Sequence, residues 1–342
     1  MKYSLTMHEH HLGINLGHDR SAAIVQDGRI VVAIQQERLD RRRYSLGYLH
    51  HAVGDDAQIQ LPGEAIRYCL DSCGLRLGDV ATITANMPGI DHAPAILRRS
   101  LPADQASKVA VLPGHHLAHA YSSYWPSGFD AAVVLIVDAS GNTSPDRRTE
   151  SYSLFEARGE HLRKIHGEDV SAHLAELSTL GFVYEFITRK AGLVTRAGPA
   201  VSVPESGKLM GLAAYGGEQV NWHRWLEPRE GSYRIGISAY DILLEVAALE
   251  ARYDDGQGTP YLRPYLVDLA FKVQRELEEA LLHVVGLAVR QTGLKKVCMG
   301  GGVALNSVAN YRVLRDLSLE DIFIFPAAGD AGIAAGCALW AY

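Results

Sequence analysis

The feature that most restricts the fold of this chain is a pattern of strands and polar turns that occurs twice. The first copy begins with the apolar segment 12–16, which the polar turn 17–20 separates from a second apolar segment at 21–25. Asp27-Gly28 predicts a tight hairpin turn, after which residues 29–35 return as a third strand. A polar, glycine-containing turn between two strands is a place where backbone N–H groups can hold a phosphate.

The same order of segments returns near the middle of the chain. An apolar run ends at Asp138 in a polar glycine turn, and two further strand-like segments follow at 150–156 and 161–166. Two copies of one strand unit predict an α/β fold with two lobes, an N-terminal lobe over 1–128 and a C-terminal lobe over 129–342. If the lobes face each other, their polar turns line one cleft.

Two histidines and two aspartates form a candidate metal site. His115 and His119 are four residues apart on a helix-compatible segment, so both imidazoles lie on one face and can converge on one ion. Asp138 ends the central strand, and Asp330 lies in the turn that opens the last helix. This ligand set suits Fe(II), Mn(II) or Zn(II). The alternative is a pair of ordinary surface or interface histidines, and the two aspartate turns argue against it.

A glycine triplet marks a candidate nucleotide site. The strand predicted over 296–299 runs into Gly300-Gly301-Gly302, and Asn306 stands where the next helix begins. Glycines at such a junction let the backbone approach an anionic or flat ligand closely. The alternative is a tight connection required only for packing. Lys208 lies in another glycine-rich stretch that lacks the spacing of a P-loop.

The remaining periodic segments predict helices over 62–74 and 265–293, whereas 222–264 has no pattern that can be interpreted. The chain has 342 residues, 47% of them hydrophobic and 21% charged, as expected of a soluble globular protein. A net charge of -6 argues against a nucleic-acid partner. The four cysteines lie in apolar segments and are expected to be reduced core thiols of a cytoplasmic protein. No segment predicts a membrane span or a signal peptide.

Taken together, several segments resemble the O-carbamoyltransferases of the nodulation-factor and antibiotic-tailoring type. The matching segments follow the order of that family and are GINLGHDRSAAIVQDGRIVVAIQQER, HHLAHAYSSYWPSGFDAAVVLIVDASGN, ESGKLMGLAAYG, MGGGVALNSVAN and PAAGDAGIAAGCAL. The resemblance is to the family's N-terminal domain, which is related to the tRNA threonylcarbamoyl-transfer enzymes. It implies a two-lobed fold of the actin and sugar-kinase type, with a duplicated ribonuclease-H-like topology and a nucleotide in the cleft.

In such enzymes ATP and carbamoyl phosphate first give carbamoyl-adenylate, from which the carbamoyl group passes to a hydroxyl of a small-molecule acceptor. The resemblance implies that this chain catalyses the second step with a divalent metal on the nucleotide phosphate, Fe(II) before Mn(II) or Zn(II). It assigns the metal to His115, His119, Asp138 and Asp330. It places His18 and Asp19 near the reacting carbonyl and matches Lys208, as a further catalytic residue, to the lysine of an EGK-like segment. It assigns nucleotide contacts to Gly141, Gly211, Gly301, Gly302 and Asn306.

The YrdC-like domain that makes carbamoyl-adenylate in this family is absent from these 342 residues. We therefore expect either a fragment or a separate YrdC-like partner that supplies the adenylate. The sequence leaves the acceptor and any homo-oligomer open. Two alternatives remain at this point, which are a sugar-kinase relative that phosphorylates a small molecule and a non-catalytic nucleotide-binding subunit. Paired histidines argue against the kinase, because enzymes of that class hold Mg²⁺ mainly through carboxylates and phosphate oxygens.

Overall fold

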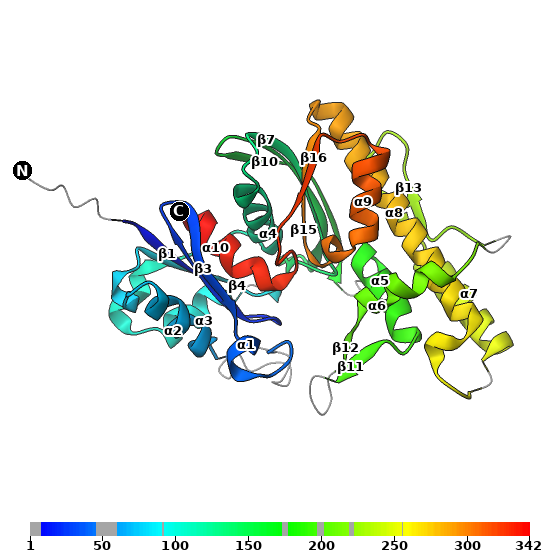
Figure 1. The fold of residues 1–342 in the computed structure, drawn as a ribbon, viewed down its shortest axis with the longest axis horizontal. Coiled ribbons are helices and arrows are strands. Elements are labelled where there is room, and N and C mark those ends of the chain that lie inside the picture. The colour runs from blue at the N-terminus through cyan, green and yellow to red at the C-terminus, as the bar shows by residue number, and fades with distance from the viewer. Residues whose placement is uncertain are drawn as a thin grey trace, which may run out of the picture. The chain divides into compact units, whose positions relative to one another are not determined.

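The computed structural model describes residues 8–45, 60–90, 92–172, 177–196, 202–218, 222–254 and 256–342. The chain divides into two compact units, of which the first combines residues 1–128 with 325–342 and the second comprises residues 129–324. Figure 1 shows the elements of both, coloured along the chain. No helix among the described residues is long and apolar enough to cross a membrane.

The first unit is built on a mixed sheet with the strand order β3-β2-β1-β4-β6. Its strands are β1 (His10–Asn15), β2 (Ser21–Gln26), β3 (Arg29–Gln35), β4 (Thr82–Asn86) and β6 (Val109–Ala110). β1, β2 and β3 are antiparallel, whereas β4 runs parallel to β1 and β6 parallel to β4. The predicted hairpin turn at Asp27-Gly28 is present, with positive φ angles of 48° and 77° that match a type I′ turn.

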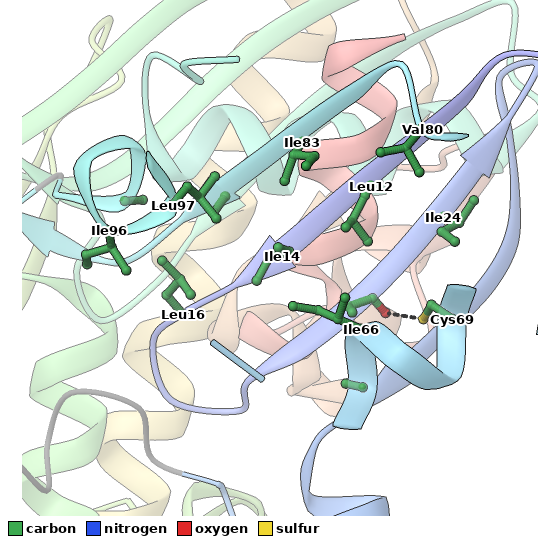
Figure 2. Close-up of a cluster of buried hydrophobic side chains, with 14 of the residues drawn as sticks. Leu12, Ile14, Leu16, Ile24, Ile66, Cys69, Val80, Ile83, Ile96 and Leu97 are labelled. Carbon is green, nitrogen blue, oxygen red and sulfur yellow. Dashed lines mark hydrogen bonds between the residues drawn. The ribbon is translucent and has the colours of Figure 1, made fainter. Parts of the chain in front are cut away.

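Helices cover both faces of this sheet. Alternate residues of β2 point to opposite faces, because side chains alternate along a strand. Ile24 belongs to the core beneath α2 (Gly63–Ser72) and α3 (Ala93–Ser100), as Figure 2 shows, whereas Ala23 packs against α10 (Ile333–Ala341). The helix predicted over 62–74 is thus confirmed. The remaining elements of the unit are α1 (Glu37–Asp40), α4 (His115–Tyr124), β5 (Gly89–Ile90), and the 3₁₀ turns Leu77–Asp79, Ala103–Lys108, Trp125–Ser127 and Asp330–Gly332.

The last 18 residues of the chain, 325–342, fold with the first unit, which differs from our assignment of 129–342 to one lobe. The reason is the close packing of α10, the red helix beside the blue strands in Figure 1. A Cβ on Gly13 of β1 would lie 1.8 Å from the Ala334 carbonyl oxygen, and one on Gly336 would lie 1.9 Å from that of Ala118 in α4. Glycine at position 13 lets the backbones of β1 and α10 touch, and glycine at position 336 does the same for α10 and α4.

The second unit repeats the topology of the first. Its strands are β7 (Ala131–Val137), β8 (Asn142–Thr143), β9 (Arg148–Arg158), β10 (His161–Ser171), β15 (Lys296–Gly300) and β16 (Asp321–Ile324). β7, β9 and β10 are antiparallel in succession, whereas β15 runs parallel to β7 and β16 parallel to β15. β7, β9, β10, β15 and β16 therefore correspond to β1, β2, β3, β4 and β6. The duplication predicted from the strand pattern is confirmed.

Helices of the second unit pack around α8 (Pro264–Thr292), which also contacts β7. The helix predicted over 265–293 is confirmed, and it ends at Gly293 in the left-handed conformation. The other helices are α5 (Leu180–Lys190), α6 (Ser206–Leu212), α7 (Ala239–Tyr253) and α9 (Ser307–Asp316), with 3₁₀ turns at Ala213–Tyr215, Pro260–Leu262 and Gly302–Leu305. Two small hairpins complete the unit, β11 (Val194–Arg196) with β12 (Ser202–Pro204) and β13 (Leu226–Pro228) with β14 (Ile235–Ile237).

The four cysteines are free thiols, and three of them are buried, in agreement with the prediction of core residues. The Cys69 thiol contacts the Ala22 carbonyl oxygen at 3.4 Å in the core shown in Figure 2. Burial raises the pKa of Cys69 to about 12, with a smaller contribution from Cys73. Cys69 is therefore a packing residue with little thiolate character.

Candidate functional site

The first component of the site is the pair of histidines on α4. The helix begins at His115 directly after Gly114, so His115 and His119 fall one turn apart on the same face. Both side chains are fully buried. Their Nε2 atoms are 3.2 Å apart, with the two rings nearly perpendicular. The two nitrogen atoms therefore converge on one point inside the first unit.

Asp330 reaches the same point from the turn before α10. Its Oδ1 atom lies 3.5 Å from the Nε2 atom of His115 and 3.5 Å from that of His119, and the residue is 5% exposed. A triangle with these sides has a point about 2 Å from all three atoms, which is the usual metal–ligand distance for imidazole and carboxylate. The three ligand atoms thus fit a single divalent ion.

Two asparagines at the ends of parallel strands hold these groups in place. Asn86 ends β4, and its Oδ1 atom lies 2.7 Å from Nδ1 of His115. Because an amide oxygen only accepts hydrogen bonds, Nδ1 of His115 carries the proton and Nε2 presents a lone pair. Asn15 ends β1 and donates through Nδ2 to the carbonyl oxygens of Asp330 at 2.9 Å and His18 at 2.8 Å. The sheet thereby fixes both the tautomer of one ligand and the backbone of another.

His18 and Asp19 form the turn that follows β1, where Asp19 adopts a positive φ of 55°. Nδ1 of His18 lies 2.8 Å from Oδ2 of Asp19, and its Nε2 lies 3.1 Å from Oδ2 of Asp330. The His18 side chain is 42% exposed, so it connects the buried cluster with solvent. Burial raises the pKa of Asp330, but while His18 and His115 are protonated, their charges and hydrogen bonds from His115 and His119 outweigh burial and hold that pKa well below its usual range.

Asp138 belongs to the second unit, where it follows β7. Its Oδ1 atom accepts a hydrogen bond from the Ala139 N–H at 2.7 Å. Glycines surround this strand end: a Cβ on Gly301 would lie 2.2 Å from the Val137 carbonyl oxygen, and one on Gly302 would lie 3.0 Å from Oδ1 of Asp138. Gly301 also has a φ of 86°. Close packing and backbone conformation therefore require these glycines, and their nucleotide contacts stay a prediction.

Asn306 is the N-terminal cap of α9 and accepts a hydrogen bond from the Ala309 N–H at 3.0 Å. Its amide also pairs with Gln274 of α8, at 2.7 Å and 3.1 Å in the two directions. Gln274 in turn accepts a hydrogen bond from the Tyr184 hydroxyl on α5 at 2.8 Å. Asn306 thus connects the start of α9 to two neighbouring helices, and contact with a nucleotide stays a prediction.

Lys208, Gly211 and Gly141 are the remaining predicted residues of the second unit. Lys208 lies on α6 with a side chain that is 62% exposed, and its ammonium group is 3.4 Å from Glu205. A Cβ on Gly211 would meet open space. The Gly141 N–H donates to the Glu150 carbonyl oxygen at 2.9 Å, which ties the turn after Asp138 to β9.

The structure therefore brings together five of the predicted residues within the first unit: His18, Asp19, His115, His119 and Asp330. In the second unit it places Gly301 and Gly302 against the end of β7. The sequence reasoning missed Asn15 and Asn86. A signal was present, because each asparagine is the polar last residue of a buried strand, and the two strands are parallel neighbours with Asn15 opposite Asn86.

Comparison with known proteins gives a family model and several relatives. The model described as Carbamoyltransferase N-terminus matches residues 94–339. The chain is 28% identical to the nodulation protein NolNO of Sinorhizobium fredii, over 94% of this chain and 46% of that protein. It is 24% identical to the tRNA N6-adenosine threonylcarbamoyltransferase of Bacillus subtilis, over 86% of this chain and 78% of that protein. The resemblance noted in the sequence is thereby confirmed.

Solved structures agree at the level of the fold. HypF of T. kodakarensis superposes with a TM-score of 0.58 at 16% identity, over 98% of this chain and 47% of that chain. The chain has the mixed α/β fold of the actin and sugar-kinase type, as the resemblance implied. It spans about half the length of the first curated relatives that it matches.

Proposed function

Because the chain belongs to the carbamoyltransferase family through its N-terminal domain, we propose that it transfers a carbamoyl group from carbamoyl-adenylate to a hydroxyl of a small-molecule acceptor. The observation that carries this proposal is the convergence of His115, His119 and Asp330 beside His18 inside the first unit. Buried imidazoles with a carboxylate form a site for a divalent ion, and a half-exposed histidine next to it is a group that can accept a proton.

We propose that His115, His119 and Asp330 hold the ion, with Asp138 as a further ligand. Fe(II) is the favoured metal and Mn(II) or Zn(II) the alternatives, because the ligands are borderline nitrogen and hard oxygen atoms. When held by these residues, the ion would supply positive charge to neutralise the phosphate oxygens of the leaving AMP. The asparagine partner of His115 supports this assignment, because a neutral imidazole held by its other nitrogen is the usual form of a metal-ligating histidine.

In the proposed reaction the acceptor oxygen forms a bond to the carbamoyl carbon, and the bond from that carbon to the adenylate phosphate oxygen breaks. His18 accepts the hydroxyl proton at Nε2, which the acceptor contacts in place of Asp330, and Asp19 orients the ring through the contact at Nδ1. The two carboxylates at 2.8 Å and 3.1 Å stabilise the imidazolium that forms. A general base positioned in this way contributes about 10²- to 10⁴-fold to the rate.

For the second unit, we propose that the glycine-rich ends of its strands and helices hold the nucleotide. The proposed contacts are Gly141, Gly211, Gly301, Gly302 and Asn306, with Lys208 at the phosphate. The open space over Gly211 supports this, as does the contact between Met210 and Ser307, which brings α6 beside the start of α9. We propose that the adenylate itself comes from a separate YrdC-like domain or protein.

The test is calorimetric titration of ATP, AMP and a non-hydrolysable carbamoyl-adenylate mimic, with Fe(II) or Mn(II) and then with a chelator. We expect the mimic to bind more tightly than ATP and to lose that advantage when the chelator is added. The His119→Gln variant should lose the metal dependence, whereas His116→Gln, which alters the neighbouring buried imidazole of the same helix, should keep it. If ATP binds more tightly than the mimic and the chelator changes neither affinity, the proposal is contradicted, and a kinase or a non-catalytic subunit is favoured.

A further inference from the structure

Helix α7 (Ala239–Tyr253) exposes apolar side chains along most of its length. Tyr240 is 71% exposed, Leu243 48% and Leu244 51%. The alanines at the next positions on this face are also exposed, and they are Ala247, Ala248 and Ala251. The six residues follow the spacing i, i+3, i+4, i+7, i+8 and i+11, which places them on one continuous helix face. We call this set of six the α7 face.

The opposite side of α7 packs on its own unit, so the α7 face points away from that core. Ile242 and Val246 are buried. The indole N–H of Trp225 donates to Glu245 at 2.5 Å, and Lys190 binds Glu250 at 2.8 Å. These contacts hold the helix against α5 and against Trp225, the residue directly before β13. An exposed row of tyrosine, leucine and alanine therefore remains on a helix that is firmly anchored.

Side-chain size is distributed unevenly along the α7 face. Its N-terminal half carries the large residues Tyr240, Leu243 and Leu244, and its C-terminal half carries only alanines. If a second α7 lies antiparallel across it, with the twofold axis midway between positions 245 and 246, each large residue meets an alanine. Tyr240 then faces position 251, Leu243 faces 248, and Leu244 faces 247. Large side chains opposite small ones are what close helix packing requires.

We propose that α7 is a self-association helix, which pairs antiparallel with α7 of a second copy of this chain. The pairing is isologous, because one twofold axis brings the same surface from both copies together. This proposal goes beyond the carbamoyl-transfer function and does not depend on it.

Charge along the border of the α7 face agrees with this pairing. Asp241 near the start of the helix and Arg252 near its end lie on the same flank, about 20° apart around the helix axis. In the antiparallel pair, Asp241 of one copy therefore lies beside the partner's Arg252, and the reverse contact forms at the other end. In a parallel pair the two copies of this flank would lie on opposite sides of the interface, so Asp241 and Arg252 would not meet, and this charge pair forms only in the antiparallel arrangement.

The size of the surface predicts a weak dimer. A helix of 15 residues is about 22 Å long, and one helix pair buries less than the roughly 800 Å² per partner of a standard stable interface. We therefore expect a reversible monomer–dimer equilibrium that depends on protein concentration over the micromolar range.

The first test is sedimentation equilibrium of the whole chain over a range of concentrations. Wild type should dimerise, and Ala248→Glu should weaken dimerisation at least roughly tenfold, because it buries a carboxylate opposite Leu243 of the second copy. The matched control is Ala95→Glu, which introduces the same change at an exposed alanine of α3 in the other unit and should leave the equilibrium unchanged. A wild type that stays monomeric up to about 100 μM, or an Ala248→Glu variant that dimerises equally well, overturns the proposal.

The second test fixes the orientation by cross-linking in a Cys73→Ser background. An equimolar mixture of Tyr240→Cys and Ala251→Cys chains should form a disulfide between the two variants under mild oxidation. Ala251→Cys alone should not, because two copies of position 251 would be about 16 Å apart along the axis of an antiparallel pair. Efficient cross-linking of Ala251→Cys with itself would mean a parallel or unspecific contact and would overturn the antiparallel arrangement.

Discussion

The strand pair β1 and β4 of the first unit corresponds to the pair β7 and β15 of the second, and the two pairs end differently. β1 and β4 end in Asn15 and Asn86, whose amides hold Asp330, His18 and His115. β7 and β15 end in Asp138 and the glycine triplet, where two backbones meet with no room for a side chain. The same fold unit thus appears once with asparagines that position other side chains and once with glycines that let two backbones meet beside Asp138.

This difference separates two kinds of sensitivity to mutation. At the strand ends of the first unit, a substitution removes a hydrogen bond from a side chain that has a chemical role, so binding should suffer more than folding. At the strand ends of the second unit, a substitution forces two backbones apart, so folding should suffer first. Of the three changes below, which come in order of decreasing effect, the first two test this distinction and the third tests the proposed nucleotide contact on α6.

Gly301→Ala should have the largest effect, on stability. The new methyl group would lie 2.2 Å from the Val137 carbonyl oxygen, at a residue with a φ of 86°. Overlap and backbone strain together should lower the free energy of unfolding by more than about 4 kcal/mol, or prevent folding. Urea unfolding followed by circular dichroism measures this change.

The control for that change is Gly207→Ala in α6, where a Cβ meets open space. Alanine is the better helix former, so this variant should be as stable as wild type or gain up to about 1 kcal/mol. If both variants unfold at the wild-type urea concentration, the glycine triplet is not required for packing, and a ligand contact becomes its main explanation.

Asn86→Ala should act mainly on metal binding. It removes the hydrogen-bond partner of Nδ1 of His115, which fixes the orientation and tautomer of that ring. Loss of such an outer partner typically lowers metal affinity by about 10- to 100-fold, equivalent to about 1.4 to 2.8 kcal/mol. Competition with a chromophoric chelator measures the affinity of Mn(II) or Zn(II) directly, without an activity assay.

A control substitution on the same face of β4 distinguishes loss of the contact that positions His115 from general damage to the strand. Thr84→Val replaces a buried residue two positions earlier with one of similar size. We expect its metal affinity to equal that of wild type, even if its stability falls. Equal losses of metal affinity in Thr84→Val and Asn86→Ala would show that Asn86 acts through the strand and not through His115.

The sequence predicted the repeated strand unit because the alternation of apolar strands with polar turns is a local pattern. It also predicted α8, whose apolar residues recur at helical spacing over 29 residues. It did not predict that residues 325–342 fold with the first unit. That assignment depends on contacts between distant positions, such as Gly13 with Ala334, which no local pattern reports.

The candidate site was predictable where spacing or a motif fixed it. His115 and His119 are brought together by one turn of helix, and His18 and Asp19 are neighbours in the chain. The roles of Asn15 and Asn86 required the knowledge that β1 and β4 are adjacent and parallel.

Helix α7 was missed for another reason. Its apolar residues lie on both the buried and the exposed side, so the helical periodicity that reveals α8 is absent there.

Lys208→Met should have the smallest effect of the three changes. The lysine side chain is 62% exposed, and its ion pair with Glu205 at 3.4 Å is screened by solvent, so stability should change by less than about 0.5 kcal/mol. If the ammonium group contacts the nucleotide phosphate as proposed, affinity for the carbamoyl-adenylate mimic should fall a few-fold, equivalent to less than about 1 kcal/mol. Lys208→Arg keeps the charge and should keep most of the affinity. Unchanged affinity in Lys208→Met, measured by calorimetry beside its unfolding curve, would remove Lys208 from the proposed site and leave the glycines and Asn306 to hold the nucleotide.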